Sequence, residues 1–137
     1  MRYLLDTNVC IALINERPLS VRTHFDRKLS QDSNVYASSI VVFELWYGIS
    51  KSLRRGANTQ LLAGFLSGPI HQLAFDEEDA RFAGELRAEM ETIGRPVGQY
   101  DLLIAGQALR HKMTLVTANS REFGRIKTLS WEDWSKS

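Results

Sequence analysis

The feature that most constrains the fold is an alternation of short apolar runs with segments of helical periodicity. The short runs predict strands at residues 3–5, 35–37, 71–75, 114–117 and 129–131. Apolar residues at helical spacing predict helices over residues 8–15, 20–29, 40–52, 58–66, 76–93 and 100–111. Short strands separated by helices predict an α/β sandwich around a mainly parallel sheet.

The bulk properties predict one ordinary globular domain, residues 1–137. The chain has no repeat or linker, and its 44% hydrophobic and 24% charged residues are typical of such domains. Asp6 and Glu44 interrupt the most apolar stretches, so we expect no export signal and no membrane-spanning helix. The single cysteine, Cys10, fits a reducing compartment, and we expect a cytoplasmic protein. The net charge of +1 provides no global attraction for nucleic acid.

Four polar residues fall near the same edge of the predicted sheet. Asp6 directly follows the first strand, and Asn119 lies just past the fourth. Asp101 opens the helix that leads into the fourth strand, and Glu44 lies in the helix after the second. Right-handed crossovers bring strand ends and helix starts to one edge, where ligands bind in such sheets. We therefore expect these side chains to form one site.

Three carboxylates at one site predict a divalent cation. Mg²⁺ prefers oxygen ligands, as does Mn²⁺, and either ion would relieve the repulsion between the acids. A cation held there would polarise a phosphate and activate water for attack. The sequence therefore predicts a metal-dependent endoribonuclease with Asp6, Glu44 and Asp101 as catalytic metal ligands, and Asn119 as a catalytic helper.

Each of these residues also has a purely structural explanation. Asp6 is a suitable helix cap, and Asp101 suits the positive end of a helix dipole. Asn119 lies in a turn-like context, where asparagine is frequent. Glu44 is surrounded in sequence by apolar residues, so burial against an arginine would be its structural role. The convergence of all four on one edge favours the functional interpretation.

The histidines, the basic residues and the aromatic residues of the sequence say less about function than these four residues do. The three histidines lack the spacing of zinc ligands, and we expect them on the surface or on strand faces. Basic residues near the candidate edge suit either phosphate contacts or a solvated face. They are Lys51, Arg54, Arg55, Arg95, Arg121, Arg125 and Lys127. We expect Phe43, Trp46 and Tyr47 to pack in the core rather than stack on bases or form an oligomer contact.

Several motifs resemble those of the PIN-domain ribonucleases, and more closely the VapC-type toxins of type II toxin–antitoxin pairs. The resemblance spans nearly the whole chain. Its motifs are Leu5-Asp6-Thr7-Asn8, Ser38-Ser39 before Glu44, Gly98-Gln99-Tyr100-Asp101 with Ile104-Ala105, and Val116-Thr117-Ala118-Asn119 with Glu122-Phe123. The resemblance implies a three-layer α/β/α fold, Mg²⁺ or Mn²⁺ dependence, a homodimer and inhibition by a cognate VapB-type antitoxin. The internal run Gly94 to Gly98 and the ending Glu132 to Ser135 resemble those of a branch of the family whose members tend to cleave initiator tRNA in its anticodon stem-loop.

Two positions depart from the family pattern. Many relatives have Asp in place of Asn119, which weakens the case for a second metal and favours one metal in the resting protein. Gln99 stands where relatives often have Pro, so we expect a looser start of the helix there.

Two other functions remain open. A metal-dependent phosphatase of small phosphomonoesters would share acids after strand ends, but it usually has a second Asp at the position of Asn8. A catalytically weak PIN module that only binds RNA or protein is compatible with Asn119.

Overall fold

The computed structural model describes residues 1–136, which form seven helices around a five-stranded sheet. All strand pairs are parallel and the strand order is β3-β2-β1-β4-β5. The strands are β1 (Arg2–Leu5), β2 (Asn34–Ser38), β3 (His71–Leu73), β4 (Thr114–Val116) and β5 (Trp131–Glu132). The predicted α/β class is confirmed, and the sheet is wholly rather than mainly parallel.

The helices lie close to their predicted places, with one addition. They are α1 (Thr7–Asn15), α2 (Leu19–Ser30), α3 (Ser39–Lys51), α4 (Arg55–Leu66), α5 (Glu77–Thr92), α6 (Gln99–His111) and α7 (Ser120–Phe123). The short helix α7 was not predicted, because four residues are too few to show a helical period. Among residues 1–136, no helix combines the length and apolar character that crossing a membrane requires.

Side-chain caps and one turn residue place the helices that matter for the site. Asp6 caps α1 by accepting a hydrogen bond from the Val9 N–H at 2.9 Å. Ser38 caps α3 by accepting from the Ile40 N–H at 3.1 Å. After α5, Gly94 takes a left-handed conformation at φ 70°, which turns the chain back toward α6.

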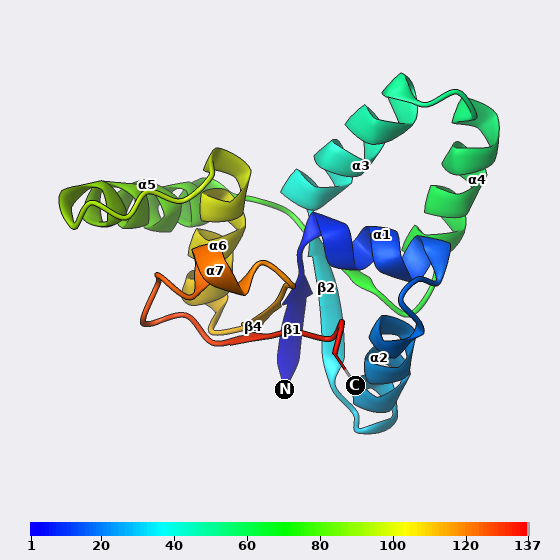
Figure 1. The fold of residues 1–137 in the computed structure, drawn as a ribbon, viewed down its shortest axis with the longest axis horizontal. Coiled ribbons are helices and arrows are strands. Elements are labelled where there is room, and N and C mark those ends of the chain that lie inside the picture. The colour runs from blue at the N-terminus through cyan, green and yellow to red at the C-terminus, as the bar shows by residue number, and fades with distance from the viewer. Residues whose placement is uncertain (137) are drawn as a thin grey trace.

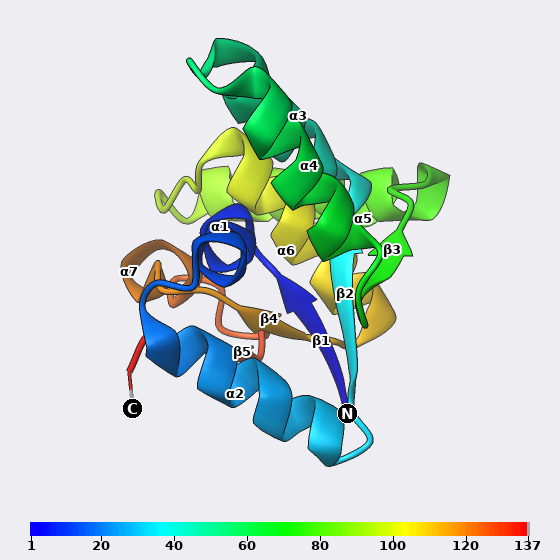
Figure 2. The same cartoon turned by 90° about the vertical axis from the view of Figure 1, so that its right-hand side faces the viewer.

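The helices cover both faces of the sheet (Figures 1 and 2). Helices α1 and α2 lie on one side, and α5 and α6 lie on the other. Helices α3 and α4 form a hairpin that rises beyond the ends of the strands, next to α1. Strands β1 and β2 point toward this end of the molecule. The starts of α1 and α3 therefore meet at the carboxyl edge of the sheet.

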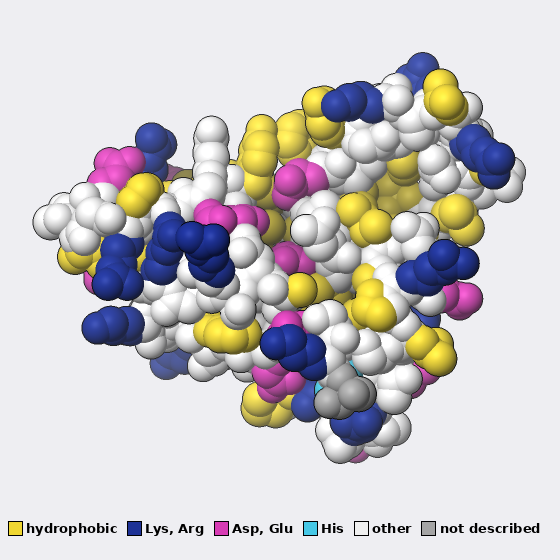
Figure 3. Space-filling model, viewed as in Figure 1, with side chains coloured by type: hydrophobic (Ala, Val, Ile, Leu, Met, Phe, Trp, Pro, Cys, Tyr) yellow, Lys and Arg dark blue, Asp and Glu magenta, His cyan; other side chains and the backbone are white. Residues whose placement is uncertain are grey.

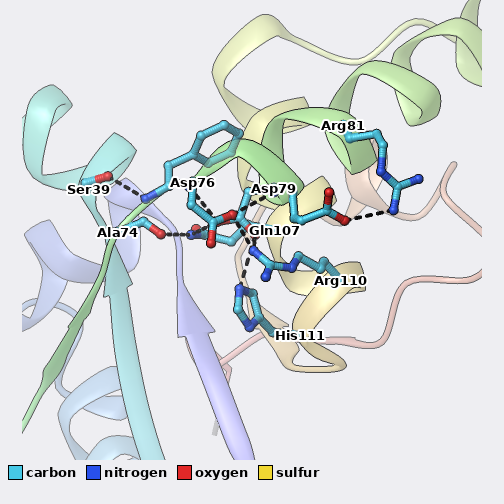
Figure 4. A network of polar contacts seen from close by, with 10 residues as sticks. Ser39, Ala74, Asp76, Asp79, Arg81, Gln107, Arg110 and His111 are labelled. Atoms are coloured by element: carbon cyan, nitrogen blue, oxygen red, sulfur yellow. Dashed lines mark hydrogen bonds and ion pairs between the residues drawn. The ribbon is translucent and has the colours of Figure 1, made fainter.

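A buried carboxylate fastens α5 to α6 (Figure 4). The Asp79 side chain is fully buried and accepts from Gln107 Nε2 at 2.9 Å, Arg110 Nη1 at 2.9 Å and His111 Nε2 at 3.1 Å. It also accepts from the Asp76 N–H, which completes a capping box at the start of α5. His111, expected on the surface, is thus part of an ion-pair network.

One expectation about the core is wrong. Phe43, Trp46 and Tyr47 are 52%, 44% and 59% exposed, so they do not pack in the core of this chain. Helix α3 buries Val41 and Leu45 instead. Because α3 is apolar nearly all round, its sequence does not show which side faces the chain's own core. The exposed side of α3 is an aromatic face of Phe43, Trp46 and Tyr47.

Candidate active site

Asp6 lies at the point where β1 ends and α1 begins. Its side chain is only 5% exposed, and its role as the cap of α1 fixes its position. Burial raises the pKa of the Asp6 carboxyl, and the negative charge of Glu44 raises it further. The capping role and a functional role are compatible, because the cap bond uses one carboxylate oxygen, Oδ1.

Glu44 is half-buried in the second turn of α3. Its Oε1 accepts a hydrogen bond from the Thr7 hydroxyl at 2.7 Å, which connects α3 to the first residue of α1. Glu44 is less buried than its apolar sequence context suggests, because its neighbour Phe43 is 52% exposed while Leu45 faces the core. The structural alternative, a buried ion pair with an arginine, is wrong. Within residues 1–136, Glu44 takes part in no salt bridge.

Asp101 lies in the first turn of α6, as predicted. The pKa of its carboxyl is raised to about 6 by burial and by the negative charges of Glu122, Asp6 and Glu44, in that order. Neighbouring charges have such an effect only at short range. Asp101 therefore shares one region with three other acids, which come from the first strand end, α3 and α7.

Asn119 and Glu122 complete this region from the other side. The Asn119 Nδ2 lies 3.4 Å from Asp101 Oδ2 and donates to Glu122 Oε2 at 3.2 Å. Glu122 also accepts from the Gly98 N–H, just before α6. A side chain at Gly98 would meet Glu122, since a Cβ there would lie 2.9 Å from Oε1.

Glu122 is a site residue that reasoning from periodicity missed. Its only sequence signal is its place in the motif after Asn119, because α7 is too short to be predicted. It supplies the negative charge that Asn119 lacks. We define the acid centre as Asp6, Glu44, Asp101 and Glu122, together with Asn119.

Among residues 1–136, no basic side chain forms a salt bridge with the acid centre. None of the salt bridges found within residues 1–136 involves one of its four acids. The uncompensated charge and the all-oxygen set of ligands suit a hard divalent cation. As the side chains stand, however, no three acids, histidines or cysteines in the described residues close around a single point. Glu44 accepts a hydrogen bond from Thr7 and Glu122 accepts one from Gly98, so these side chains would have to rotate to hold one cation together with Asp6 and Asp101.

The surface around the acid centre is divided by charge (Figure 3). Asp and Glu side chains gather in the middle of this face, below hydrophobic side chains of the α3 region. Lys and Arg side chains gather beside them, over α7 and the loop that follows it. The near-neutral net charge of the whole chain therefore hides two local regions of opposite sign.

Comparison with known proteins gives the family. The sequence model of the PIN domain matches residues 3–129. The "tRNA(fMet)-specific endonuclease VapC" of Shigella flexneri is 42% identical over 135 residues, covering 98% of this chain and 99% of the relative. "Ribonuclease VapC2" of Rickettsia felis is 41% identical over 136 residues, covering 99% and 100%.

Solved structures agree with these relatives. VapBC2 from Rickettsia felis, bound to a DNA fragment from its promoter, has a TM-score of 0.90 at 38% identity and covers 98% of this chain and 99% of the solved one. DNA-bound VapBC from Salmonella typhimurium has a TM-score of 0.89 at 40% identity and covers 98% of each chain. Since sequence and fold match from end to end, the chain belongs to the PIN-domain family, among its VapC proteins.

Proposed function

We propose that this chain, as one PIN domain over residues 1–137, is an endoribonuclease and the toxin of a toxin–antitoxin pair. The observation that supports this most is the acid centre, where four carboxylates from separate elements lie in one region and, within residues 1–136, form no salt bridge. The names of its VapC relatives supply the substrate, RNA. PIN ribonucleases generally depend on divalent metals, and we assign Mg²⁺, with Mn²⁺ as a substitute.

The residues of the acid centre have distinct roles in this proposal. Asp6, Glu44 and Asp101 hold the cation, and the α1 cap keeps Asp6 in place. When bound, the cation offsets the carboxylates and stabilises the charge that develops on the scissile phosphate as water attacks. Glu122 holds the Asn119 amide, so that its Nδ2 points toward Asp101. Asn119 thereby fixes the orientation of the Asp101 carboxylate.

The test measures cleavage of RNA by the purified wild type in Mg²⁺ and in EDTA. The variants Asp6→Asn, Glu44→Gln and Asp101→Asn are measured in Mg²⁺ in the same way. We expect EDTA to abolish cleavage and each substitution to lower the rate by about 100-fold or more. Glu85→Gln, an exposed acid on α5, is the matched control and should cleave normally. Cleavage that survives EDTA and Asp6→Asn would refute the metal centre. Hydrolysis of a phosphomonoester without RNA cleavage would identify a phosphatase, and RNA binding alone would identify a weak PIN module.

Initiator tRNA is the substrate we assign. Two relatives that match 98% of the chain are named for tRNA(fMet). Sequencing the ends of cleaved total RNA should place the cut in the anticodon stem-loop of this tRNA. Cuts spread over many RNAs would refute this assignment while leaving the nuclease activity intact.

An apolar groove beside the acid centre suits a cognate VapB-type antitoxin. It has a volume of about 340 Å³, and Glu44 is one of its lining residues. Its apolar lining comes from α1, α3 and α4 and comprises Ile11, Ile14, Leu45, Ile49, Leu61 and Leu62. The solved VapBC structures contain such a pair of proteins. An apolar segment in the groove would bring a neighbouring basic side chain to the acid centre.

The groove assignment is tested with Leu61→Glu, because Leu61 is 50% exposed and its replacement leaves the core intact. We expect this variant to cleave RNA normally but to escape inhibition by the cognate VapB-type antitoxin. Leu19→Glu at the start of α2 is the control, because Leu19 is 68% exposed and lies outside the groove. Full inhibition of Leu61→Glu would show that the antitoxin binds elsewhere.

A homodimer is the assembly we assign, and the aromatic face of α3 is its contact. Phe43, Trp46 and Tyr47 are all more than two-fifths exposed, and Tyr100 packs against Phe43 with ring centroids 5.7 Å apart. Contiguous exposed aromatic side chains usually mark a protein interface.

We further assign the protein to the cytoplasm, where its RNA substrate is found.

A further inference from the structure

A pocket with cationic walls lies on the side of the molecule that carries α5 and the loop after α7. It has a volume of about 370 Å³. Its floor is apolar and includes Met90, Ile93 and Ile126, while Arg95, Arg125 and Lys127 contribute charge. We call these six residues the basic pocket. Its volume lies within the range of pockets that bind small organic molecules.

The charges of the basic pocket are available to a ligand. Within residues 1–136, none of its three cationic side chains forms a salt bridge, although Glu89 also lines the pocket. Arg95 and Lys127 are exposed. Ile93 is 54% exposed, so the apolar floor of the pocket is accessible from solvent. A concave apolar floor under unpaired cations is complementary to a base joined to phosphate.

A short segment, residues 96–98, connects the basic pocket to the acid centre. Arg125 Nη1 donates to the Pro96 carbonyl oxygen at 2.9 Å. Two residues further along, the Gly98 N–H donates to Glu122 of the acid centre. Figure 3 shows Lys and Arg side chains directly beside the acidic ones on this part of the surface. An RNA strand that leaves the acid centre in this direction therefore meets cations next.

We infer that the basic pocket is a subsite for an unpaired nucleotide that flanks the scissile phosphate of the RNA, an inference that rests on the proposed function. Its cations bind phosphate oxygens, and its floor of Met90, Ile93 and Ile126 receives the base. A base can enter such a floor only if it is unstacked from its neighbours, so the subsite selects single-stranded or looped RNA. Charge complementarity favours this occupant, because the acid centre alone would repel RNA.

The test measures RNA binding without cleavage. A fluorescent single-stranded oligoribonucleotide is titrated in EDTA against the wild type and the double variant Arg95→Gln/Lys127→Gln. Both substituted side chains are exposed, so the fold should tolerate the change. We expect the Kd to rise about tenfold at moderate salt, and the slope of log K against log salt to fall by about 1.4, as for two lost phosphate contacts. Arg27→Gln/Lys136→Gln removes two exposed charges from other surfaces and should leave both quantities unchanged.

Two further measurements distinguish binding of the base by the apolar floor from a general attraction of RNA by positive charge. Ile93→Ser should weaken binding of the single strand without altering the salt slope, because it removes apolar floor and no charge. A duplex of the same sequence should be insensitive to Ile93→Ser. In cleavage with Mg²⁺, the double variant should raise KM and leave kcat nearly unchanged.

Several outcomes would overturn the subsite. The first is a double variant that binds the oligoribonucleotide with the Kd and the salt slope of the wild type. The second is an Arg27→Gln/Lys136→Gln control that loses as much affinity for the oligoribonucleotide as the double variant does. Normal RNA binding combined with lost binding of the antitoxin would identify a protein-docking surface instead. Failure of the proposed function is distinguishable, because the wild type would then cut no RNA with Mg²⁺ while the binding experiment would still report on the pocket.

Discussion

The Asp101 carboxyl disfavours the folded state when it is ionised. Its pKa is raised from 3.8 to about 6 in the fold by burial and by the acids around it. The folded state therefore binds this proton more tightly than the unfolded chain does. The stability gained from protonation is full below pH 3.8 and is lost as the pH rises through about 6. At neutral pH and without a cation, the ionised carboxylates of the acid centre therefore repel one another.

Replacing Asp101 by Asn should accordingly stabilise the metal-free protein. In EDTA we expect the melting temperature of Asp101→Asn to exceed that of the wild type at about pH 7.5, and the difference to shrink toward about pH 5. Mn²⁺ should raise the melting temperature of the wild type, and more so at the higher pH, because protons compete with the cation. Differential scanning calorimetry measures both effects. A difference that grows on acidification would contradict this account.

Gly98 should matter for activity more than for stability. A Cβ there would lie 2.9 Å from Glu122 Oε1, the mobile end of a side chain, so Glu122 can move away at little cost. Its movement would release Asn119. We expect Gly98→Ala to keep its melting temperature within a few degrees while losing about 10- to 100-fold in RNA cleavage or Mn²⁺ affinity. Gly84→Ala is the control, since no atom lies within 4 Å of its added Cβ.

At the scale of elements, the pairing of α5 with α6 determines where Asp101 lies. The buried Asp79 carboxylate accepts hydrogen bonds from two residues of the same α6 face, Gln107 and Arg110, as well as from His111. Gly106 allows the close approach of the two helices, because a Cβ there would lie 2.6 Å from Ala83 Cα. The C-terminal half of α6 is thereby fastened to α5, which fixes the direction of the helix that carries Asp101 at its other end.

Removing the Asp79 carboxylate should be costly for the fold. Asp79→Ala leaves Arg110 and Gln107 facing a buried gap, and we expect the free energy of unfolding to fall by about 3–5 kcal/mol in urea denaturation. Glu85→Ala on the exposed side of α5 should cost less than about 1 kcal/mol. A small effect of Asp79→Ala would mean that the network does not fasten α6.

The elements also show what the sequence can predict. The placement of Asp6 and Asp101 followed from strand and helix patterns, because each stands at the boundary of a periodic segment. Glu122 was not found in this way, since α7 spans four residues. The exposure of Trp46 was predicted wrongly for a different reason. Hydrophobic periodicity indicates that a helix face is buried, but it does not show whether the residues that pack against it belong to the same chain or to another one.

For the whole molecule, the aromatic face of α3 makes the state of assembly measurable. Trp46→Glu places a charge in the proposed contact without touching the core, because Trp46 is 44% exposed. We expect the wild type to elute as a dimer and this variant as a monomer in size-exclusion chromatography with light scattering, with similar melting temperatures. Leu53→Glu, fully exposed beyond the end of α3, should remain dimeric. A wild-type monomer would exclude the contact.

The order of the strands has a consequence for the time during synthesis at which the protein can fold. β1 is synthesised first but pairs with both β2 and β4, and the latter spans Thr114–Val116. Asp6 and Glu122 are likewise separated by most of the chain. The acid centre cannot assemble until nearly all of the polypeptide has left the ribosome. A nascent chain from which β4 and α7 have not yet emerged therefore lacks the acid centre, and we expect it not to cleave the RNA of the translation apparatus that produces it.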